Sequence, residues 1–352
     1  MGDSSFHSPS PIPHPLQNGE GRVEMVLMLS RSDIKGLITM PEAIAALRQA
    51  HGEFSRGAAA MPVRGVIVDP AHDGWFGVMP AYLFGSGALG VKSVTVYKQN
   101  PAKGMPATLG LTVLLDPETG APISVMDAGY LTGVRTAAAS GVATSLLARE
   151  NARELAILGP GVQGRHHLMA MVAVRPIETV RVYDNNLENA EKFRQEMQPA
   201  VSATIQVVGS GEEAVRGADV IVTTSTSRTP IVEYAWLKPG AHINGVGAHA
   251  ADVRELASEV IARARVVVDS REAALKEAGD LLMPIAEGKV TPEQLSDELG
   301  EVVEGLKPGR TSPDQITVYK SVGIAIQDMA VASMVYRKAL AAKVGTEVDL
   351  LS

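Results

Sequence analysis

The spacing of hydrophobic residues changes twice along this chain and separates a tail from two folded regions. Prolines alternate with polar residues in the first 22 positions, which predicts a disordered tail and no signal peptide. From residue 24 to about 145, short apolar runs are separated by Gly, Pro and Asp, as in closely spaced strands. The runs are 63–68, 75–79, 89–97, 109–115 and 122–126. Because only one helix, 41–54, is expected among them, an antiparallel or mixed sheet is favoured.

A long helix is expected at 128–149, and strands then alternate with helical stretches. Six short apolar runs predict a parallel sheet, at 155–158, 180–183, 205–208, 219–224, 242–246 and 266–269. The segment 316–343 is again helical in its apolar spacing and is expected to return to the first region. The prediction is therefore an α/β protein with two domains. A Rossmann-type doubly wound parallel sheet domain spans 139–317, and an α+β domain is made of 23–138 with 318–352.

A glycine motif follows the first strand of this parallel sheet. The apolar run 155–158 leads into Gly159-Pro-Gly161-Val-Gln-Gly164, after which the spacing becomes helical. The order strand, tight turn and helix is the context that a dinucleotide-binding fingerprint requires. The next strand ends in Asp184, 20 residues after Gly164, where a carboxylate can accept hydrogen bonds from a ribose hydroxyl. Strand, glycines, helix and acid in register predict a dinucleotide site.

Composition narrows the remaining chemistry. The net charge of -7 disfavours a nucleic-acid partner, and no apolar run approaches the length of a membrane span. There are no cysteines, which excludes disulfides and thiolate metal sites. The neighbouring His166 and His167 point to different sides of a helix and make a poor metal pair. We expect a cytoplasmic protein that binds a small molecule and no metal.

Motifs along nearly the whole chain resemble the ornithine cyclodeaminase/mu-crystallin family, which includes archaeal-type alanine dehydrogenases and cyclic ketimine reductases. The similar stretches are Met61–Arg64, Gly90–Lys92, Asn100–Thr108, Leu131–Ser140, Gly159–Gly164, His242–Gly247 and Lys320–Gly323. The resemblance implies a homodimer in which the α+β domain serves for substrate binding and dimerisation. It also implies that Arg64, Lys92 and Arg135 hold a substrate carboxylate, a role for which cations, above all arginine forks, are suited.

The resemblance further implies which residues contact the dinucleotide. Beside Gly159, Gly161, Gly164 and Asp184, they are Thr108, Arg135, Val162, Gln163, Thr224, Val246, Gly247 and Ser321. For Thr224 and Ser321, an ordinary structural hydroxyl is an equal alternative. Asp184 favours NAD(H), since a carboxylate repels the extra phosphate of NADP, and NADPH-dependent relatives tend to carry an arginine nearby. Arg181 could alter this preference only if its side chain reached round to the site.

One departure from the family bears on the reaction. Cyclodeaminases and the alanine dehydrogenases carry an aspartate where this chain has His249, whereas the mu-crystallin branch also lacks it. His249 is either the proton donor or an ordinary loop histidine, and Lys92 is a second candidate for the proton. The leading hypothesis is an NAD(H)-dependent ketimine reductase or amino-acid dehydrogenase acting on a small 2-imino or 2-amino acid. Two alternatives stay open: an ornithine or lysine cyclodeaminase that recycles NAD, and a binding protein with little turnover.

Overall fold

A computed structural model describes residues 17–18, 22–23, 25–295 and 297–350 of the chain. It separates into two compact units: unit 1 (1–39, 53–132 and 325–352) and unit 2 (40–52 and 133–324). The boundaries predicted from the sequence, 138/139 and 317/318, stay predictions. Gln17–Asn18 (β1) pairs antiparallel with Arg22–Val23 (β2), and the prolines of the predicted tail lie outside the described residues.

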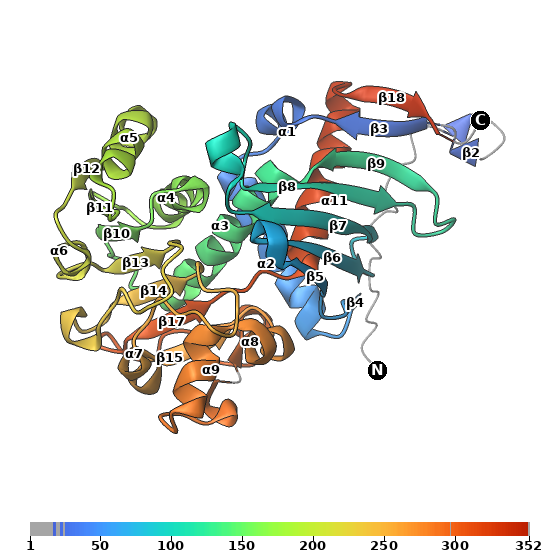
Figure 1. The fold of residues 1–352 in the computed structure, drawn as a ribbon. Coiled ribbons are helices and arrows are strands. Elements are labelled where there is room, and N and C mark those ends of the chain that lie inside the picture. Colours follow the sequence, from blue (N-terminus) through green and yellow to red (C-terminus); the bar gives the residue numbers. More distant parts are fainter. Residues whose placement is uncertain (1–16, 19–21, 24, 296, 351–352) are drawn as a thin grey trace, which may run out of the picture. The chain divides into compact units, whose positions relative to one another are not determined.

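Unit 1 is built on a mixed sheet with the strand order β18-β3-β9-β8-β7-β6-β4, and β5 pairs with β6 (Figure 1). Only β3 and β9 pair in parallel. The strands are β3 (Met25–Leu29), β4 (Ala59–Ala60), β5 (Gly65–Asp69), β6 (Gly74–Leu83), β7 (Ala88–Tyr97), β8 (Thr108–Leu115), β9 (Pro122–Asp127) and β18 (Thr346–Asp349). The expected mixed sheet is confirmed; the sequence prediction did not include β3, β4 or β18.

Two helices accompany this sheet, α1 (Arg31–Leu37) and α11 (Ala325–Ala342). Helix α11 packs across β6, β7 and β8, so the expected return of the C-terminal helix to the first region is confirmed (Figure 1). Side chains alternate along each strand. On β8, Thr112 and Leu114 are buried, whereas Leu111 is 53% exposed. One face of the sheet therefore carries α11, and the other keeps apolar side chains at its surface.

Unit 2 holds a parallel sheet of eight strands with the order β12-β11-β10-β13-β14-β17-β15-β16. Its strands are β10 (Glu154–Leu158), β11 (Thr179–Tyr183), β12 (Thr204–Val207), β13 (Val220–Thr223), β14 (His242–Gly245), β15 (Arg265–Val268), β16 (Asp297–Glu298) and β17 (Thr317–Lys320). The six predicted strands are present, and the sheet order reverses between β10 and β13, as in doubly wound folds that bind ligands at this point.

The prediction of a helix from residue 316 was wrong at its start. Residues 317–320 form β17, which lies between β14 and β15, and the helix begins only at Ala325. All four β17 residues are buried. A strand buried on both faces is apolar without alternation, so its pattern cannot be distinguished from that of a buried helix.

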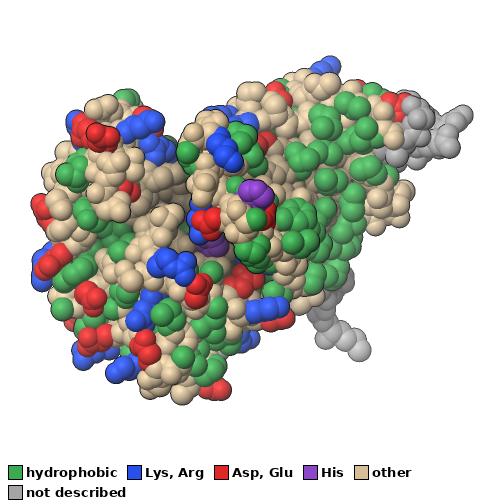
Figure 2. Space-filling model, viewed as in Figure 1, with side chains coloured by type: hydrophobic (Ala, Val, Ile, Leu, Met, Phe, Trp, Pro, Cys, Tyr) green, Lys and Arg blue, Asp and Glu red, His purple; other side chains and the backbone are tan. Residues whose placement is uncertain are grey.

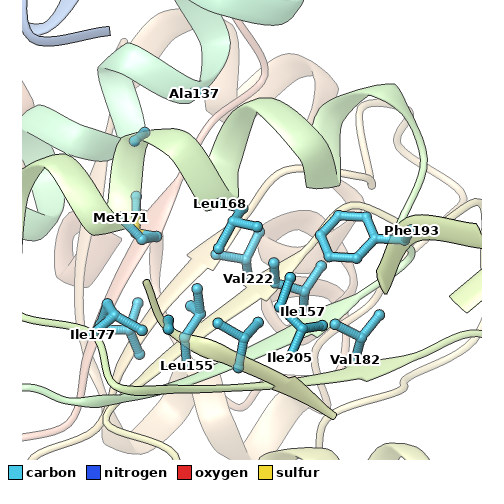
Figure 3. Close-up of a cluster of buried hydrophobic side chains, with 14 of the residues drawn as sticks. Ala137, Leu155, Ile157, Leu168, Met171, Ile177, Val182, Phe193, Ile205 and Val222 are labelled. Atoms are coloured by element: carbon cyan, nitrogen blue, oxygen red, sulfur yellow. The ribbon is translucent and has the colours of Figure 1, made fainter. Parts of the chain in front are cut away.

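Helices surround this sheet, and two of them, α2 and α3, extend across the limits of unit 2. The helices are α2 (Met40–Ser55), α3 (Ala128–Leu147), α4 (Val162–Val174), α5 (Leu187–Met197), α6 (Gly211–Val215), α7 (Ser258–Arg263), α8 (Arg271–Glu277), α9 (Gly279–Ala286) and α10 (Leu299–Val303). Figure 3 shows the core between α4 and the sheet, where Leu168 and Met171 face Leu155 and Ile157. Burying each such side chain contributes roughly 1.5 to 3 kcal/mol. This packing fixes α4 above the end of β10.

Candidate active site

Glycine stands at each of the three positions after β10 for a different physical reason. Gly159 has a φ of 91°, and a Cβ there would lie 2.7 Å from the backbone of Ser225. At Gly164 a Cβ would lie 2.8 Å from the carbonyl oxygen of Gly159, whereas at Gly161 it would meet nothing within 4 Å. The outer two glycines thus allow the tight turn and the close approach of helix and strand. The open space at Gly161 is where a pyrophosphate could approach the backbone.

Helix α4 begins directly at this turn. Its N-cap is Gly161, which has no side chain to satisfy the first N–H groups of the helix. Such a helix end attracts an anion through its unsatisfied donors and its dipole. Gln163 lies in the first turn, and its Oε1 is buried without a hydrogen-bond partner among the described residues. The uncapped helix end would fit a phosphate of a bound dinucleotide, and the Gln163 oxygen would fit its amide group.

Arg165, which the sequence prediction missed, stiffens the same turn. Its guanidinium donates to the carbonyl oxygens of Pro160 and Gly161 and to Glu196 of α5, at 2.8 Å from Nε to Oε2. The side chain also lies over the ring of Phe193, 5.5 Å from its centre. No motif signals this role, because Glu196 and Phe193 are about thirty residues away in sequence.

Asp184 lies just beyond the C-terminal end of β11. Its Oδ1 accepts hydrogen bonds from the backbone N–H of Asn186, at 2.9 Å, and from the Asn189 side chain, at 3.2 Å. Oδ2 has no hydrogen-bond partner among the described residues, which leaves an acceptor for a ribose hydroxyl. Arg181 does not reach round, because its side chain donates to Ala214 and faces Glu154.

A buried carboxylate, Glu255, joins the loops after β13 and β14. Its Oε1 accepts from the backbone N–H and the hydroxyl of Ser225, at 2.7 and 2.6 Å. Its Oε2 accepts from the N–H of Gly247 at 2.7 Å. Burial, together with the nearby Asp280, raises the pKa of Glu255. The predicted Thr224 belongs to the same assembly, since its hydroxyl donates to Gly159 at 2.7 Å and so holds the glycine turn.

A second buried carboxylate, Asp269, organises the loop after β17. Its Oδ2 accepts from the Ser321 hydroxyl at 3.0 Å and from the N–H groups of Val322 and Gly323 at 2.9 and 2.7 Å. Burial raises the pKa of Asp269. The predicted Ser321 therefore orders its own loop. Gly323 has a φ of 76°, and a Cβ there would lie 2.2 Å from Nη1 of Arg135, so the Arg135 guanidinium packs directly on this loop.

A third carboxylate connects these loops to β17. Asp280 of α9 accepts from the N–H groups of Glu255 and Leu256, at 2.7 and 2.9 Å. Its other oxygen is 2.8 Å from Nζ of Lys320, and both side chains are fully buried. The ends of β13, β14, β15 and β17 are thereby tied together by three carboxylates that no sequence motif had indicated.

In unit 1, Lys92 is fixed by a residue that the sequence prediction missed. Lys92 lies on β7, and its Nζ is 2.8 Å from the Asp328 carboxylate on α11, with both side chains 1% exposed. Arg64 lies in the loop just before β5 and is half-buried, so its predicted place within a strand was wrong. Thr108 is the first residue of β8 and pairs with Val96.

The loop histidine is held through one ring nitrogen. His249 is exposed, and its Nδ1 lies 2.9 Å from the carbonyl oxygen of Gly247. Because a carbonyl only accepts, Nδ1 carries the proton in this contact, and a further proton on Nε2 would make His249 an acid. Val246 is 9% exposed and Val162 66% exposed, so Val162 presents its side chain at the surface beside the turn.

The described residues also bear on two other classes of protein, metal-binding and membrane-spanning. They contain no group of three or more His, Asp or Glu side chains placed to hold a metal ion. His167 is instead a core residue, held by Ser140 and the carbonyl of Gln163. Among the described helices none is long and apolar enough to cross a membrane.

Residues 24–343 match the model of the ornithine cyclodeaminase/mu-crystallin family. The ketimine reductase mu-crystallin of Mus musculus is 41% identical over 293 residues, which covers 82% of this chain and 90% of that protein.

Two solved structures are also similar. The Delta(1)-pyrroline-2-carboxylate reductase of Thermococcus litoralis, in complex with NADH and L-proline, has a TM-score of 0.90 and 43% identity. The match covers 92% of this chain and all of that one. An archaeal alanine dehydrogenase dimer with bound NAD has a TM-score of 0.88 and 37% identity, and the match covers 93% of this chain and all of that one.

Proposed function

Because this chain belongs to the ornithine cyclodeaminase/mu-crystallin family, we propose that it is an NAD(H)-dependent reductase of small 2-imino carboxylates that also oxidises the corresponding amino acids. The observation that carries the redox part of this proposal is the dinucleotide turn. Gly159 and Gly164 bring backbone against backbone, whereas Gly161 leaves open space at an uncapped helix end. Bound NADH would supply a hydride to the imine carbon.

The substrate class rests on what the three similar proteins have in common. A pyrroline carboxylate reductase, a ketimine reductase and an alanine dehydrogenase all act at a carbon–nitrogen bond. The pyrroline substrate and alanine each carry a carboxylate at that carbon. Such a substrate needs cations to bind it and a proton for its nitrogen. Arg64, Lys92 and Arg135 are proposed as the cations, and His249 or Lys92 as the source of the proton.

The test is steady-state reduction of candidate imines with NADH and with NADPH. The panel is Δ1-pyrroline-2-carboxylate, piperideine-2-carboxylate, iminosuccinate precursors, pyruvate with ammonia or methylamine, and glyoxylate with an amine. We expect turnover of at least one cyclic or linear 2-imino acid, with NADH preferred. Ammonia release from ornithine or lysine with catalytic NAD would instead support cyclodeamination. Cofactor binding without any turnover would favour a binding protein.

Arg135 gives a residue-level test of the substrate part. Arg135 is 4% exposed and its guanidinium packs on the Gly323 loop, so an alanine there removes a cation from a fixed position. We expect Arg135→Ala to raise the KM of the imino acid about 10- to 100-fold, the value of a lost charged hydrogen bond. NADH affinity, read from its fluorescence, should stay within about threefold. Unchanged kinetics would contradict a role in substrate binding.

We also propose that the chain forms a homodimer. The sheet face opposite α11 carries Met28, 36% exposed, and Leu111, 53% exposed. The adjoining strand β5 exposes Val66, Ile67 and Val68 by 49, 67 and 68%. Figure 2 shows hydrophobic side chains gathered over the strands of this sheet. An apolar sheet face of this kind favours association, and the archaeal alanine dehydrogenase is a dimer.

A further inference from the structure

In unit 2, a cavity opens at the edge of the sheet where β10, β11 and β17 begin. Its volume is about 630 Å³, within the range of small-molecule sites. The lining comes from the end of α3 with the loop 148–151, from Arg175 after α4, and from the loop 310–313 before β17. The glycine turn and Asp184 follow the carboxyl ends of β10 and β11, at the other edge of the same parallel sheet. The cavity is therefore separate from the proposed dinucleotide site.

Three arginines line this cavity. Arg149 pairs with the Asp219 carboxylate, but Lys238 shares that carboxylate at 2.7 Å. Arg175 and Arg310 form no ion pair with any carboxylate that the structure describes. The cavity thus gathers more guanidinium groups than the neighbouring acids can pair.

These arginines are close enough to repel one another. Burial, together with the charges of Arg149 and Arg175, lowers the pKa of Arg310 to about 10. Burial also lowers the pKa of Arg175, although the charge of Glu150 raises it. An arginine with such a pKa is still protonated at neutral pH, so the cavity carries fixed positive charge. A bound anion would relieve the repulsion.

Support of the fold does not account for this much charge. Nη2 of Arg175 donates to the carbonyl oxygens of Thr144 and Ser145 at 2.8 and 3.1 Å. Nε of Arg310 donates to that of Leu147 at 2.8 Å. The two arginines thereby satisfy the last carbonyls of α3, whose helix dipole amounts to about half a negative charge. These bonds hold the guanidinium groups in place, but the carbonyls are neutral and most of the positive charge stays uncompensated.

The lining also holds donors that the described part of the chain does not use. Arg149 bonds to Asp219 through Nη2, whereas its Nε is buried without a hydrogen-bond partner among the described residues. A buried donor without a partner is costly, and a bound acceptor would remove that cost. The side chains of Asn151, Thr311 and Ser312 line the same cavity and form no hydrogen bond with a described residue. Guanidinium, hydroxyl and amide donors together suit an oxyanion.

We propose that this cavity binds the phosphate group of a small phosphate ester. A phosphate monoester carries nearly two negative charges at neutral pH, which matches the two guanidinium groups that lack a carboxylate partner. The cavity is much larger than one phosphate, so it also accommodates the polar body of the ester. The inference concerns a second site and does not depend on the proposed reductase activity.

Titration calorimetry of the full chain tests the proposal, with excess NADH present to occupy the dinucleotide site and with ionic strength held constant. The probes are ribose 5-phosphate, inorganic phosphate and ribose. We expect ribose 5-phosphate to bind, phosphate to bind more weakly, and ribose not to bind. Phosphate that binds as tightly as the ester would show that the site takes the free anion. If neither phosphate compound binds up to about 10 mM, the proposal is overturned.

Two threonine variants locate the binding, whether or not NADH fills its own site. Thr311 lines the cavity and is exposed, so Thr311→Glu places a carboxylate beside the arginines without disturbing the core. We expect this variant to bind phosphate about tenfold or more weakly, the effect of a lost charged contact. Thr204→Glu makes the same change at an exposed threonine of β12 outside the lining and should bind like wild type. Equal losses in both variants, or no loss in Thr311→Glu, would refute this location.

Discussion

At the residue scale, the carboxylate of Asp184 is the feature that favours one dinucleotide over the other. One of its oxygens holds the local turn through Asn186 and Asn189, and the other is left for a ribose hydroxyl. A phosphate on that ribose would bring a second negative charge against the carboxylate. Arg181, the nearby cation on β11, is directed at Glu154 instead. The proposed preference for NADH therefore depends on one charge.

Asp184→Ser should weaken that preference. The serine hydroxyl can still accept a hydrogen bond from the turn, but the repulsion between the carboxylate and a 2′-phosphate is removed. We expect the ratio of kcat/KM for NADPH to that for NADH to rise about tenfold or more, which corresponds to about 1.4 kcal/mol. Asn189→Ala is the control, since it removes a partner of the same oxygen without altering charge. A wild-type enzyme that already prefers NADPH would refute the assignment.

A second residue-scale prediction concerns His167, which lies in the core of unit 2. Burial lowers the pKa of His167 to about 4, although its hydrogen bond to the Gln163 carbonyl raises the pKa; the charge of His166 adds to the lowering. In the unfolded chain this histidine has its ordinary pKa near 6.5. As the pH falls, it is therefore protonated in the unfolded chain before it is protonated in the folded protein. Stability is thus lost as pH falls from about 6.5 to about 4, and the loss amounts to about 2 kcal/mol at pH 5.

The measurement is the difference in unfolding free energy between wild type and His167→Gln. That difference should shrink by about 2 kcal/mol between pH 7 and pH 5, because the variant has no histidine to protonate. The difference between the two proteins is measured because burial raises the pKa of Glu255 and of Asp269. The contribution of these two carboxyl groups to stability changes with pH in the opposite sense to that of His167. His72→Gln, at a side chain 68% exposed, controls for a histidine lost at the surface. A pH-independent difference would contradict a neutral buried His167.

At the element scale, the turn between β10 and α4 makes a graded prediction. Gly159→Ala strains a φ of 91° and pushes a methyl group against Ser225, so we expect loss of several kcal/mol of stability and of NADH binding. Gly161→Ala meets open space and should fold with nearly unchanged stability. Its methyl group would nevertheless occupy the path of the pyrophosphate and raise the NADH Kd about tenfold or more. Thermal unfolding and NADH fluorescence separate the two effects, and tight NADH binding by Gly161→Ala would place the phosphate elsewhere.

The same elements show what a sequence can and cannot reveal. The glycine turn and Asp184 were predictable because their chemistry is local: strand, turn, helix and acid follow one another within about thirty residues. Asp328 was not, since it meets Lys92 only after a separation of 236 residues. Glu255 and Asp269 were likewise missed, because each accepts mainly backbone N–H groups, which leave no pattern of side chains.

At the scale of the whole molecule, the proposed homodimer rests on the apolar face of the unit 1 sheet that lies opposite α11. Along β8 the side chains alternate between the face that packs on α11 and the face that bears Leu111. A monomer would leave this face and the apolar strand β5 in water. A C2 dimer would bury the same patch on both copies at once. The apolar face of the unit 1 sheet therefore supports the proposed homodimer.

A single charge on this face should prevent association. In a C2 dimer through this face, the carboxylate of Leu111→Glu would face the same region of the other copy. It would lose its hydration there without gaining a partner. We expect wild type to elute as a dimer and Leu111→Glu largely as a monomer in size-exclusion chromatography with light scattering. Leu306→Glu, at a leucine that is 68% exposed in unit 2, is the matched control and should remain dimeric. A monomeric wild type would contradict the proposed homodimer, and a dimeric Leu111→Glu variant would place its interface on another face.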